Sequence, residues 1–419
     1  MNLSYSDLNS AAAHYGSPFY VIDRARFECN FDELTAAFES RYRPFVLAYS
    51  YKTNYVPYLC RLVRDRGGWA EVVSRMEYDL ALKVGCDPRR IIFNGPVKRR
   101  EDLELALAGG SVVNLDSQAE FEAVLRYAAA HPTQTVKVGL RVNIALSDEA
   151  GRSHIQNRLK VGRFGFDPAA IAAAARTLQG EKNIRIAALH GHTSTSDSSV
   201  WCFQTITETL VHLAERLFPT SVEAINVGGG MFGIIEPEHR WCEAPSFSEY
   251  AETVCGVLNR SEWVRQSRPA LVIEPGVAMV ANAMSFVTRV VSVKQVRDKT
   301  FVTVDGSALN SKPTFHAINP PFEILSGSGA SGSEQTFDVV GSTCMEKDIL
   351  LREVSAPLPS AGDFIRLNRV GAYTLVLTPP FIHPAPAVLA QEGDRVICVR
   401  RRQTLDDLFS CYTFDFDAV

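Results

Sequence analysis

The chain has 419 residues, and its 43 Lys and Arg residues against 47 Asp and Glu residues give a formal net charge of −4. Hydrophobic residues make up 46% of the chain and charged residues 21%, which is the balance of an ordinary globular protein. These values exclude a collagen, a coiled coil, a disordered chain and a disulfide-stapled mini-domain, and the mildly acidic charge gives no electrostatic footprint for nucleic acid.

The chain also lacks the sequence signals of a membrane or secreted protein. No apolar run approaches the roughly 20 residues needed to cross a bilayer. Segment 1–16 lacks the basic region and apolar stretch of a signal peptide. We therefore expect a cytoplasmic protein with no membrane and no nucleic-acid partner. The nine cysteines are odd in number and show no metal-binding spacing, so we expect reduced and mostly buried thiols.

From about residue 45 to 275, short apolar runs alternate with longer amphipathic stretches, several of which end in Gly as helices commonly do. Such alternation over roughly 230 residues predicts an α/β fold, specifically a TIM-type (β/α)₈ barrel, with a doubly wound open sheet as the alternative. The expected strands are 45–51, 69–73, 91–94, 111–115, 137–142, 184–190, 224–227 and 270–274.

The sequence changes in character after residue 276. Val-rich runs are separated by clusters of Pro, Gly and Ser, with almost no helical periodicity, and this pattern predicts an antiparallel β-domain. The run 19–23, before the barrel, is expected to pair into the same sheet. We predict a barrel over residues 25–275 and a second domain from 1–24 and 276–419. Its expected strands lie in 284–296, 300–306, 336–341, 363–368 and 394–401.

Charged and glycine-rich residues recur at the ends of the predicted barrel strands. Active sites of such barrels gather at the carboxyl ends of the strands, so we expect these residues to surround one pocket. They are Lys52, Glu71, Arg141, His190, His192, Gly228, Gly229, Gly230, Glu274 and Gly276.

Lys52 and the three glycines suggest a cofactor that carries an aldehyde and a phosphate. Burial lowers the pKa of a lysine amine and suits it to Schiff-base chemistry, although Lys52 alone could also extend to solvent. Gly228–Gly230 expose backbone N–H groups that can hold a phosphate, and their place after the seventh strand favours this over a flexible turn.

Glu274 and the histidines are consistent with such a cofactor. A carboxylate at the end of the eighth strand could pair with the protonated ring nitrogen of pyridoxal 5′-phosphate (PLP), or form an ordinary salt bridge. His190 and His192 match no zinc-binding pattern, so we predict no metal site. An imidazole stacked on a cofactor ring fits their spacing better.

Taken together, the motifs resemble those of the barrel-fold (type III) PLP-dependent decarboxylases that act on diaminopimelate, ornithine, lysine and arginine. The resemblance extends over nearly the whole chain. It rests on YSYKTN at 49–54, GRFGF at 162–166, LHGHTSTS at 189–196, NVGGG at 226–230, IEPG at 273–276, GSTCMEKD at 341–348 and GAYT at 371–374.

The resemblance implies a homodimer with two shared active sites and a β-sandwich as the second domain. Lys52 would be the Schiff-base lysine, and Cys344 would reach the site across the dimer interface, where it or Lys52 protonates the α-carbon after CO₂ is lost. His192 would lie over the ring, and Glu274 would face the ring nitrogen. The phosphate would be near Ser194, Thr195, Gly228, Gly229, Gly230 and Tyr373, with Glu71, Arg141 and Gly276 also at the cofactor site.

The departures from the family pattern concern mainly the substrate. The family's E-P-G-R reads E-P-G-V here, with Val277 in place of a cationic phosphate contact. The acid that follows the cysteine and holds the distal amine of the substrate is replaced by Met345, with Glu346 one place later. An Arg that helps hold a substrate carboxylate is replaced by Lys312, a point charge without the bidentate fork. We expect Lys312, Glu346 and Asp348 at the substrate.

These observations predict a PLP-dependent α-decarboxylase whose substrate is a diamino-acid derivative, such as a citrate conjugate in siderophore or other specialised metabolism. The first alternative is decarboxylation of a free diamino acid, namely diaminopimelate, lysine or ornithine. An amino-acid racemase and a non-catalytic homologue that acts as a binding partner are further alternatives.

Overall fold

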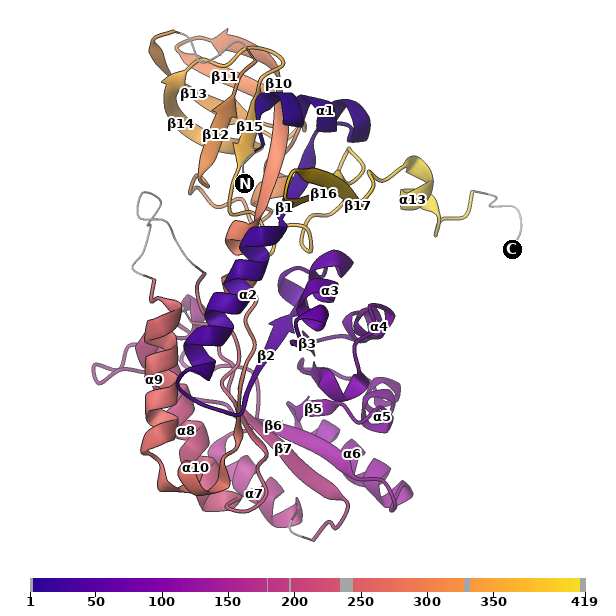
Figure 1. Cartoon of the computed structure of the whole chain (residues 1–419), viewed down its shortest axis with the longest axis vertical. Helices are drawn as coiled ribbons and strands as arrows, with labels where there is room; N and C mark the ends of the chain where they lie inside the picture. The colour runs from indigo at the N-terminus through magenta and orange to yellow at the C-terminus, as the bar shows by residue number, and fades with distance from the viewer. Residues whose placement is uncertain (1–2, 179, 196, 234–243, 328–331, 415–419) are drawn as a thin grey trace. The chain divides into compact units, whose positions relative to one another are not determined.

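The computed structural model describes the chain except residues 1–2, 179, 196, 234–243, 328–331 and 415–419 (Figure 1). Contacts between residues divide the chain into two compact units. One unit is Cys29–Met279, which contains a barrel. The other is formed by Met1–Glu28 with Val280–Val419, and it contains a β-sheet.

The barrel is closed and all its strand pairings are parallel, so the open-sheet alternative is wrong. Closure comes from the pairing of the first and last barrel strands, in which Leu47 lies beside Ile273. Every predicted barrel strand is present, with ends that differ by one residue at most. The strands are β2 (Phe45–Ser50), β3 (Trp69–Val72), β4 (Ile91–Phe93), β5 (Val112–Leu115), β6 (Val136–Arg141), β7 (Ile184–His190), β8 (Ala224–Asn226) and β9 (Ala270–Ile273).

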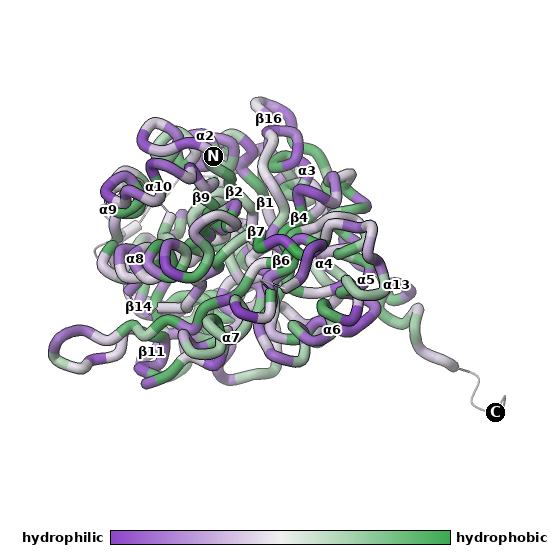
Figure 2. The backbone as a smooth tube through the Cα atoms, turned by 90° about the horizontal axis from the view of Figure 1, so that it is seen from below, coloured by the Kyte–Doolittle hydropathy of each residue, from purple (hydrophilic) through white to green (hydrophobic). Residues whose placement is uncertain are grey.

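Helices connect the barrel strands and lie outside them (Figure 2). Two of these helices, α4 and α6, have a serine N-cap. The hydroxyl groups of Ser74 and Ser117 accept hydrogen bonds from the backbone N–H of Glu77 and Glu120, respectively. The helices of this region are α2 (Arg24–Glu39), α3 (Pro57–Asp65), α4 (Arg75–Lys83), α5 (Arg100–Ala108), α6 (Gln118–Ala130), α7 (Pro168–Leu178), α8 (Val200–Leu217), α9 (Phe247–Arg260), α10 (Glu262–Ser267) and α11 (Val277–Val280).

The second unit is built on a nine-stranded sheet with the order β14-β13-β11-β10-β1-β16-β17, in which β15 also pairs with β10 and β12. The predicted pairing of segment 19–23 into this sheet is confirmed, because β1 (Phe19–Asp23) pairs with β10 and β16. The others are β10 (Met284–Val296), β11 (Lys299–Val304), β12 (Phe322–Leu325), β13 (Glu334–Val340), β14 (Ile349–Pro357), β15 (Phe364–Leu367), β16 (Ala387–Glu392) and β17 (Arg395–Arg400).

Most pairings of this sheet are antiparallel, as predicted, but β1 pairs with β16 and β11 pairs with β13 in parallel. A hydrophobic core of the unit joins α1 (Tyr5–Tyr15) to the sheet through Leu8, Phe19, Val287 and Leu389. Two further short helices, α12 (Ala308–Ser311) and α13 (Leu405–Phe409), belong to this unit.

The helices and the cysteines of the described residues bear on two of the expectations from the sequence. None of the described helices is long and apolar enough to cross a membrane. The eight described cysteines are free, but only Cys60, Cys86, Cys202 and Cys255 are buried. The expectation of mostly buried thiols is therefore wrong, because the other four lie at partly or fully exposed positions where no core surrounds them.

Candidate active site

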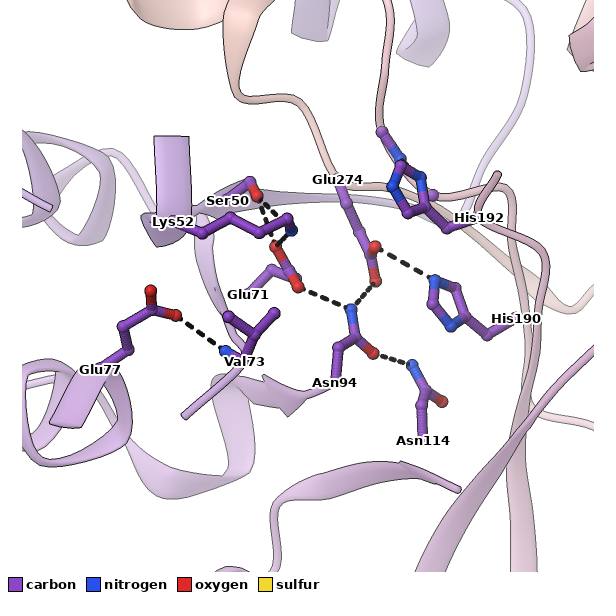
Figure 3. A network of polar contacts seen from close by, with 12 residues as sticks. Ser50, Lys52, Glu71, Val73, Glu77, Asn94, Asn114, His190, His192 and Glu274 are labelled. Atoms are coloured by element: carbon purple, nitrogen blue, oxygen red, sulfur yellow. Dashed lines mark hydrogen bonds and ion pairs between the residues drawn. The ribbon is translucent and has the colours of Figure 1, made fainter. Parts of the chain in front are cut away.

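Lys52 lies in the 3₁₀ turn Tyr51–Thr53 that follows β2, at the carboxyl end of the barrel (Figure 3). Its Nζ atom is 2.6 Å from Oε2 of Glu71 and 2.7 Å from Oγ of Ser50. The Glu71 side chain is fully buried, whereas the Lys52 side chain keeps 31% of its surface exposed. The amine is thus anchored on one side by a buried carboxylate and remains accessible on the other.

Glu71 is linked to Glu274 through an asparagine that sequence reasoning missed. The Nδ2 group of Asn94 donates to Oε1 of Glu71 at 2.8 Å and to Oε1 of Glu274 at 2.9 Å. Asn114 in turn donates to Oδ1 of Asn94 at 2.7 Å (Figure 3). A signal for these residues was present, because each is a polar residue that ends or interrupts an apolar strand.

Glu274 is 2% exposed and follows β9. Its Oε1 atom also accepts a hydrogen bond from Asn226 at 2.7 Å, and its Oε2 atom lies 3.2 Å from Nε2 of His190. Burial alone would raise the pKa of Glu274, but His190 and the positive charge of Lys52 hold it well below its usual range. Glu274 therefore stays an anion. His190 lies at the pocket, as predicted, and Asn226 belongs to the site although it was not predicted there.

His192 lies beside His190 with its ring nearly parallel, at an interplanar angle of 7°. Its Nδ1 atom accepts a hydrogen bond from the backbone N–H of Gly229 at 3.2 Å. Burial, together with the charges of Arg141 and Lys52, lowers the pKa of His192 well below the ordinary value. His192 is thus neutral near pH 7, which suits a ring that packs on an aromatic cofactor.

The glycine loop after β8 approaches this site so closely that side chains are excluded. A Cβ atom on Gly229 would lie 2.1 Å from the carbonyl oxygen of Glu274. Gly228 has a φ angle of +70°, and a Cβ atom there would lie 2.6 Å from Cβ of His192. The sequence therefore needs glycine at both positions, and Gly230 continues the loop with a φ angle of +98°.

The remaining predicted barrel residues lie on the same side of the barrel. Arg141 is buried, donates to the carbonyl oxygen of His192 at 2.8 Å, and has Nη1 3.4 Å from Oδ1 of Asp116. Ser194 and Thr195 lie in the loop after β7. Gly276 follows β9. A cofactor contact for Arg141, Ser194, Thr195 and Gly276 stays a prediction. Ser196, which ends the motif at 189–196, lies outside the described residues.

The other predicted site residues belong to the sheet unit. Cys344 and Glu346 are exposed, and Tyr373 is 41% exposed. Lys312 is only 3% exposed, and its Nζ atom has no hydrogen-bond partner among the described residues. Their roles also stay predictions.

Asp348 has a structural role that its motif did not indicate. It is buried, and its carboxylate accepts hydrogen bonds from the backbone N–H of Ala308, from Ser307 Oγ, and from both the N–H and the hydroxyl group of Thr343. Both oxygens are thus used to hold the loop at 341–348 in place. A substrate contact of Asp348 stays a prediction.

Glu77 provides a test of how burial affects this end of the barrel. Its Oε2 atom accepts a hydrogen bond from the backbone N–H of Val73 at 2.8 Å, and burial raises the pKa of Glu77 to about 7 (Figure 3). Between the ordinary value of 4.5 and 7 the folded state binds more protons than the unfolded state, so this group makes the protein less stable as pH rises.

We expect Glu77→Gln to raise the free energy of unfolding at pH 8 by about 1–2 kcal/mol, because the variant buries no charge. The gain should shrink below pH 7 and vanish near pH 4.5. Urea unfolding at pH 5 and pH 8 measures this, with Glu208→Gln on the exposed face of α8 as the control. A variant that is less stable than the natural protein at pH 8 would contradict the prediction.

The barrel site fits PLP by three observations. An accessible amine lies on a buried carboxylate, an anionic Glu274 is available for a ring nitrogen, and the glycine loop leaves backbone open where a Cβ atom would clash. When bound, PLP supplies an electron sink for the charge that develops at the α-carbon of an amino acid. The site thus defines a PLP-dependent enzyme on a (β/α)₈ barrel.

Residues 28–281, more than half of the chain, match the family described as "Pyridoxal-dependent decarboxylase, pyridoxal binding domain". The chain belongs to this family, and it is a PLP-dependent amino-acid decarboxylase. Membership confirms the predicted decarboxylase and its cofactor, in preference to a racemase or a non-catalytic homologue.

Named relatives agree with this assignment. The chain is 28% identical over 413 residues to the diaminopimelate decarboxylase of Methanothermobacter thermautotrophicus, covering 96% of this chain and 93% of that protein. It is also 28% identical over 429 residues to the L-glutamyl-[BtrI acyl-carrier protein] decarboxylase of Niallia circulans, covering 97% and 96%. The structure of diaminopimelate decarboxylase from Helicobacter pylori complexed with L-lysine matches the fold with a TM-score of 0.84 at 23% identity, covering 96% and 98%.

Proposed function

We propose that this decarboxylase acts on an amino acid whose distal end carries an additional acidic group in place of a free amine, such as a citrate conjugate of a diamino acid in siderophore or specialised metabolism. The observation that carries the proposal is the burial of the Lys312 side chain, whose Nζ atom has no hydrogen-bond partner among the described residues. A buried ammonium group with no partner is costly, and an incoming carboxylate would compensate that cost.

A cavity in the barrel mouth supports the same proposal. Its volume is about 330 Å³, and Arg163, Gln156, Asn157 and Asn143 line it beside His192. None of the described residues that line it is acidic. A distal ammonium group would find no counterion there, whereas a carboxylate or an amide would find a guanidinium group and amide donors.

A free diamino acid remains the second candidate, because several curated relatives are diaminopimelate decarboxylases. The distal carboxylate of diaminopimelate would also suit Lys312. The relative from Niallia circulans is named as a decarboxylase of an L-glutamyl group on an acyl-carrier protein, which is an amino acid joined to a larger group. This relative is as similar to the chain as the Methanothermobacter diaminopimelate decarboxylase is, at 28% identity.

The experiment is CO₂ release from PLP-loaded protein offered a panel of substrates. The panel contains diaminopimelate, lysine, ornithine, arginine, and citrate conjugates of diaminopropionate and diaminobutyrate, with L-glutamyl carrier protein as a further member. We expect turnover of the citrate conjugates. Turnover of free diaminopimelate, lysine or ornithine alone would contradict the proposal and favour the second candidate.

Lys312→Met separates the binding role of this residue from a structural one. Burial and the nearby Arg352 lower the pKa of Lys312 to about 8, so at pH 7 its side chain is a buried ammonium group with no hydrogen-bond partner in the part of the chain that the structure describes. We expect the variant to be more stable at pH 7 by about 1–3 kcal/mol, and to bind the acidic substrate with a KM about 10–100-fold higher.

The sign of the pH dependence follows from the lowered pKa. Between pH 8 and 10.5 the unfolded state binds more protons, so the natural protein gains stability as pH rises through this window. The advantage of Lys312→Met should therefore be largest below pH 8 and shrink above it. Thermal unfolding and KM at pH 7 and pH 9.5 measure both effects, and an unchanged KM would exclude a role of Lys312 in binding.

We also propose that the enzyme works as a homodimer with shared active sites, to which Cys344 of one copy and Lys52 of the other contribute. The exposure of Cys344, Glu346 and Tyr373 supports this, because an exposed side chain is available to a second copy. Inactive Lys52→Ala and Cys344→Ala proteins, refolded together, should regain roughly a quarter of the natural activity if dimers form at random. No recovery in a mixture shown to contain mixed dimers would contradict sharing.

A further inference from the structure

Three side chains capable of binding a metal meet beside the barrel mouth, and the proposed reaction uses none of them. His154 lies in the loop after β6, Asp197 lies in the loop after β7, and Cys202 lies in the first turn of α8. The Nδ1 atom of His154 is 2.9 Å from Oδ2 of Asp197, and Sγ of Cys202 is 3.7 Å from Oδ1 of Asp197. One ligand atom of each residue lies within 4.8 Å of the other two.

The second ring nitrogen of His154 faces another carboxylate, that of Asp148. The Nε2 atom of His154 lies 3.6 Å from Oδ2 of Asp148, and Asp148 is itself held by Nε of Arg152 at 2.7 Å and by the backbone N–H of Arg152 at 2.8 Å. The His154 ring packs against Trp201, with 4.8 Å between ring centres. Histidines that bind metals usually direct their second ring nitrogen to a carboxylate in this way.

The ligand types and their exposure select the class of cation. Imidazole, carboxylate and thiolate together are ligands of zinc, and a thiolate disfavours magnesium and calcium. Cys202 is fully buried, the His154 side chain is 17% exposed and that of Asp197 is 44% exposed, so the cluster is open to solvent on the Asp197 side. A water molecule can therefore complete a tetrahedral shell.

We propose that His154 Nδ1, the Asp197 carboxylate and Cys202 Sγ form a binding site for a zinc-type divalent cation. The spacing of these residues in the sequence matches no zinc motif, because the ligands come from three segments that only the fold brings together. The cation joins the loop after β6 to the loop after β7, which already meet through the hydrogen bond from the Gln156 N–H to the Ser194 carbonyl oxygen at 2.9 Å.

Binding requires the thiol to lose its proton. In the free protein Cys202 Sγ accepts a hydrogen bond from Ser199 Oγ at 3.4 Å and donates to Oδ1 of Asp197 at 3.7 Å, so it carries a proton, whereas a cysteine binds a metal ion as the thiolate. We expect about one proton to be released for each ion bound, and the affinity to rise with pH. Calorimetric titration with Zn²⁺ in two buffers of different ionisation enthalpy measures this release.

The direct test is titration of the full-length, PLP-loaded protein with Co²⁺, recorded as a difference spectrum. We expect one equivalent to produce a near-ultraviolet sulfur-to-cobalt charge-transfer band. Cys202→Ser should abolish the band, and Asp197→Asn, which keeps the size of the side chain, should weaken it. Cys398→Ser, which removes an exposed thiol from the sheet unit, should leave it unchanged.

The outcomes distinguish this site from adventitious binding. Loss of the band in Cys202→Ser, with an unchanged circular dichroism spectrum, supports the proposal. A band that persists in Cys202→Ser, or that disappears in Cys398→Ser, would overturn it. Failure of the natural protein to bind Co²⁺ would overturn it as well, and would leave the cluster as hydrogen bonds alone.

Proteolysis tests the consequence for the loop. Arg158 and Lys160 are exposed in the loop after β6 and are two of the sites at which trypsin can cleave this loop. At a free Zn²⁺ concentration ten times the dissociation constant, cleavage at these two sites should slow by about tenfold, because only the unbound protein opens. Cys202→Ser should show no protection, and equal cleavage rates with and without Zn²⁺ in the natural protein would contradict the joining of the loops.

Discussion

Lys52→Ala is expected to abolish the covalent attachment of PLP and to lower kcat by roughly 10⁴-fold or more, equivalent to about 5.5 kcal/mol. The physical reason is that Lys52 is the amine positioned by Glu71 at 2.6 Å, at the accessible end of the barrel. The measurement is the visible absorbance of the purified protein before and after borohydride, together with CO₂ release on the substrate that the panel identifies.

A second substitution separates chemistry from folding. Lys52→Ala leaves the fully buried Glu71 without its cation, which is expected to cost about 1–3 kcal/mol of stability. Lys52→Arg keeps a cation beside Glu71 but cannot form the covalent link, so it should fold with near-natural stability and be equally inactive. Lys83→Ala, on an exposed position of α4, is the control. A borohydride-reducible chromophore in Lys52→Arg would show that another lysine holds the cofactor.

The barrel was predictable because hydrophobic periodicity and strand count are local properties of the sequence. Each strand from β2 to β9 is an apolar run followed by an amphipathic helix, and this alternation determines a parallel, closed arrangement with few competitors. The sheet unit was predicted less completely. The strands β12, β14 and β16 were missed, and the parallel pairs β1–β16 and β11–β13 were not foreseen. Whether two strands pair in parallel or antiparallel depends on contacts between residues far apart in the sequence, and the local pattern of apolar and polar residues does not contain this information.

The site was predictable where a motif placed a charged residue at a strand end. Lys52, Glu71, His192 and Glu274 were identified in this way, and the structure brings them together. The residues that connect them were missed, because Asn94 and Asn226 are neutral and lie within or directly after apolar runs. Their importance comes from hydrogen bonds across the barrel, since Asn94 joins two carboxylates that are 203 residues apart in sequence (274 − 71).

Asp348 shows what a motif leaves out. The motif at 341–348 suggested a substrate contact, but a buried carboxylate with hydrogen bonds to Ala308, Ser307 and Thr343 is a structural anchor. A sequence motif records that an acid is present and cannot tell which of its hydrogen bonds are already satisfied within the fold. Lys312 is the counterpart, because only the structure shows that its buried Nζ atom has no hydrogen-bond partner among the described residues.

Glu274→Gln is expected to lower kcat by roughly 10²–10³-fold, equivalent to about 3–4 kcal/mol, while the fold is retained. Asn94 and Asn226 both donate to Oε1 of Glu274, and the amide oxygen of glutamine can accept both bonds. The variant therefore removes the negative charge, keeps the hydrogen bonds from Asn94 and Asn226, and changes the contact of Oε2 with Nε2 of His190. Without an anion at this position a bound pyridine ring is not held in its protonated form, so the electron sink is weakened. The measurement is kcat together with the cofactor content of each chain.

The pH dependence of stability provides an independent check on Glu274. Because its pKa in the folded protein is lowered, Glu274 contributes stability that is fully present above its ordinary value of 4.5 and is lost as pH falls through the lower folded value. The loss of unfolding free energy in Glu274→Gln should therefore be largest near pH 7 and shrink toward acid, and Glu215→Gln on the exposed face of α8 is the surface control. A loss that grows toward acid would mean that Glu274 is protonated in the fold, and the proposed pairing with a ring nitrogen would then fail.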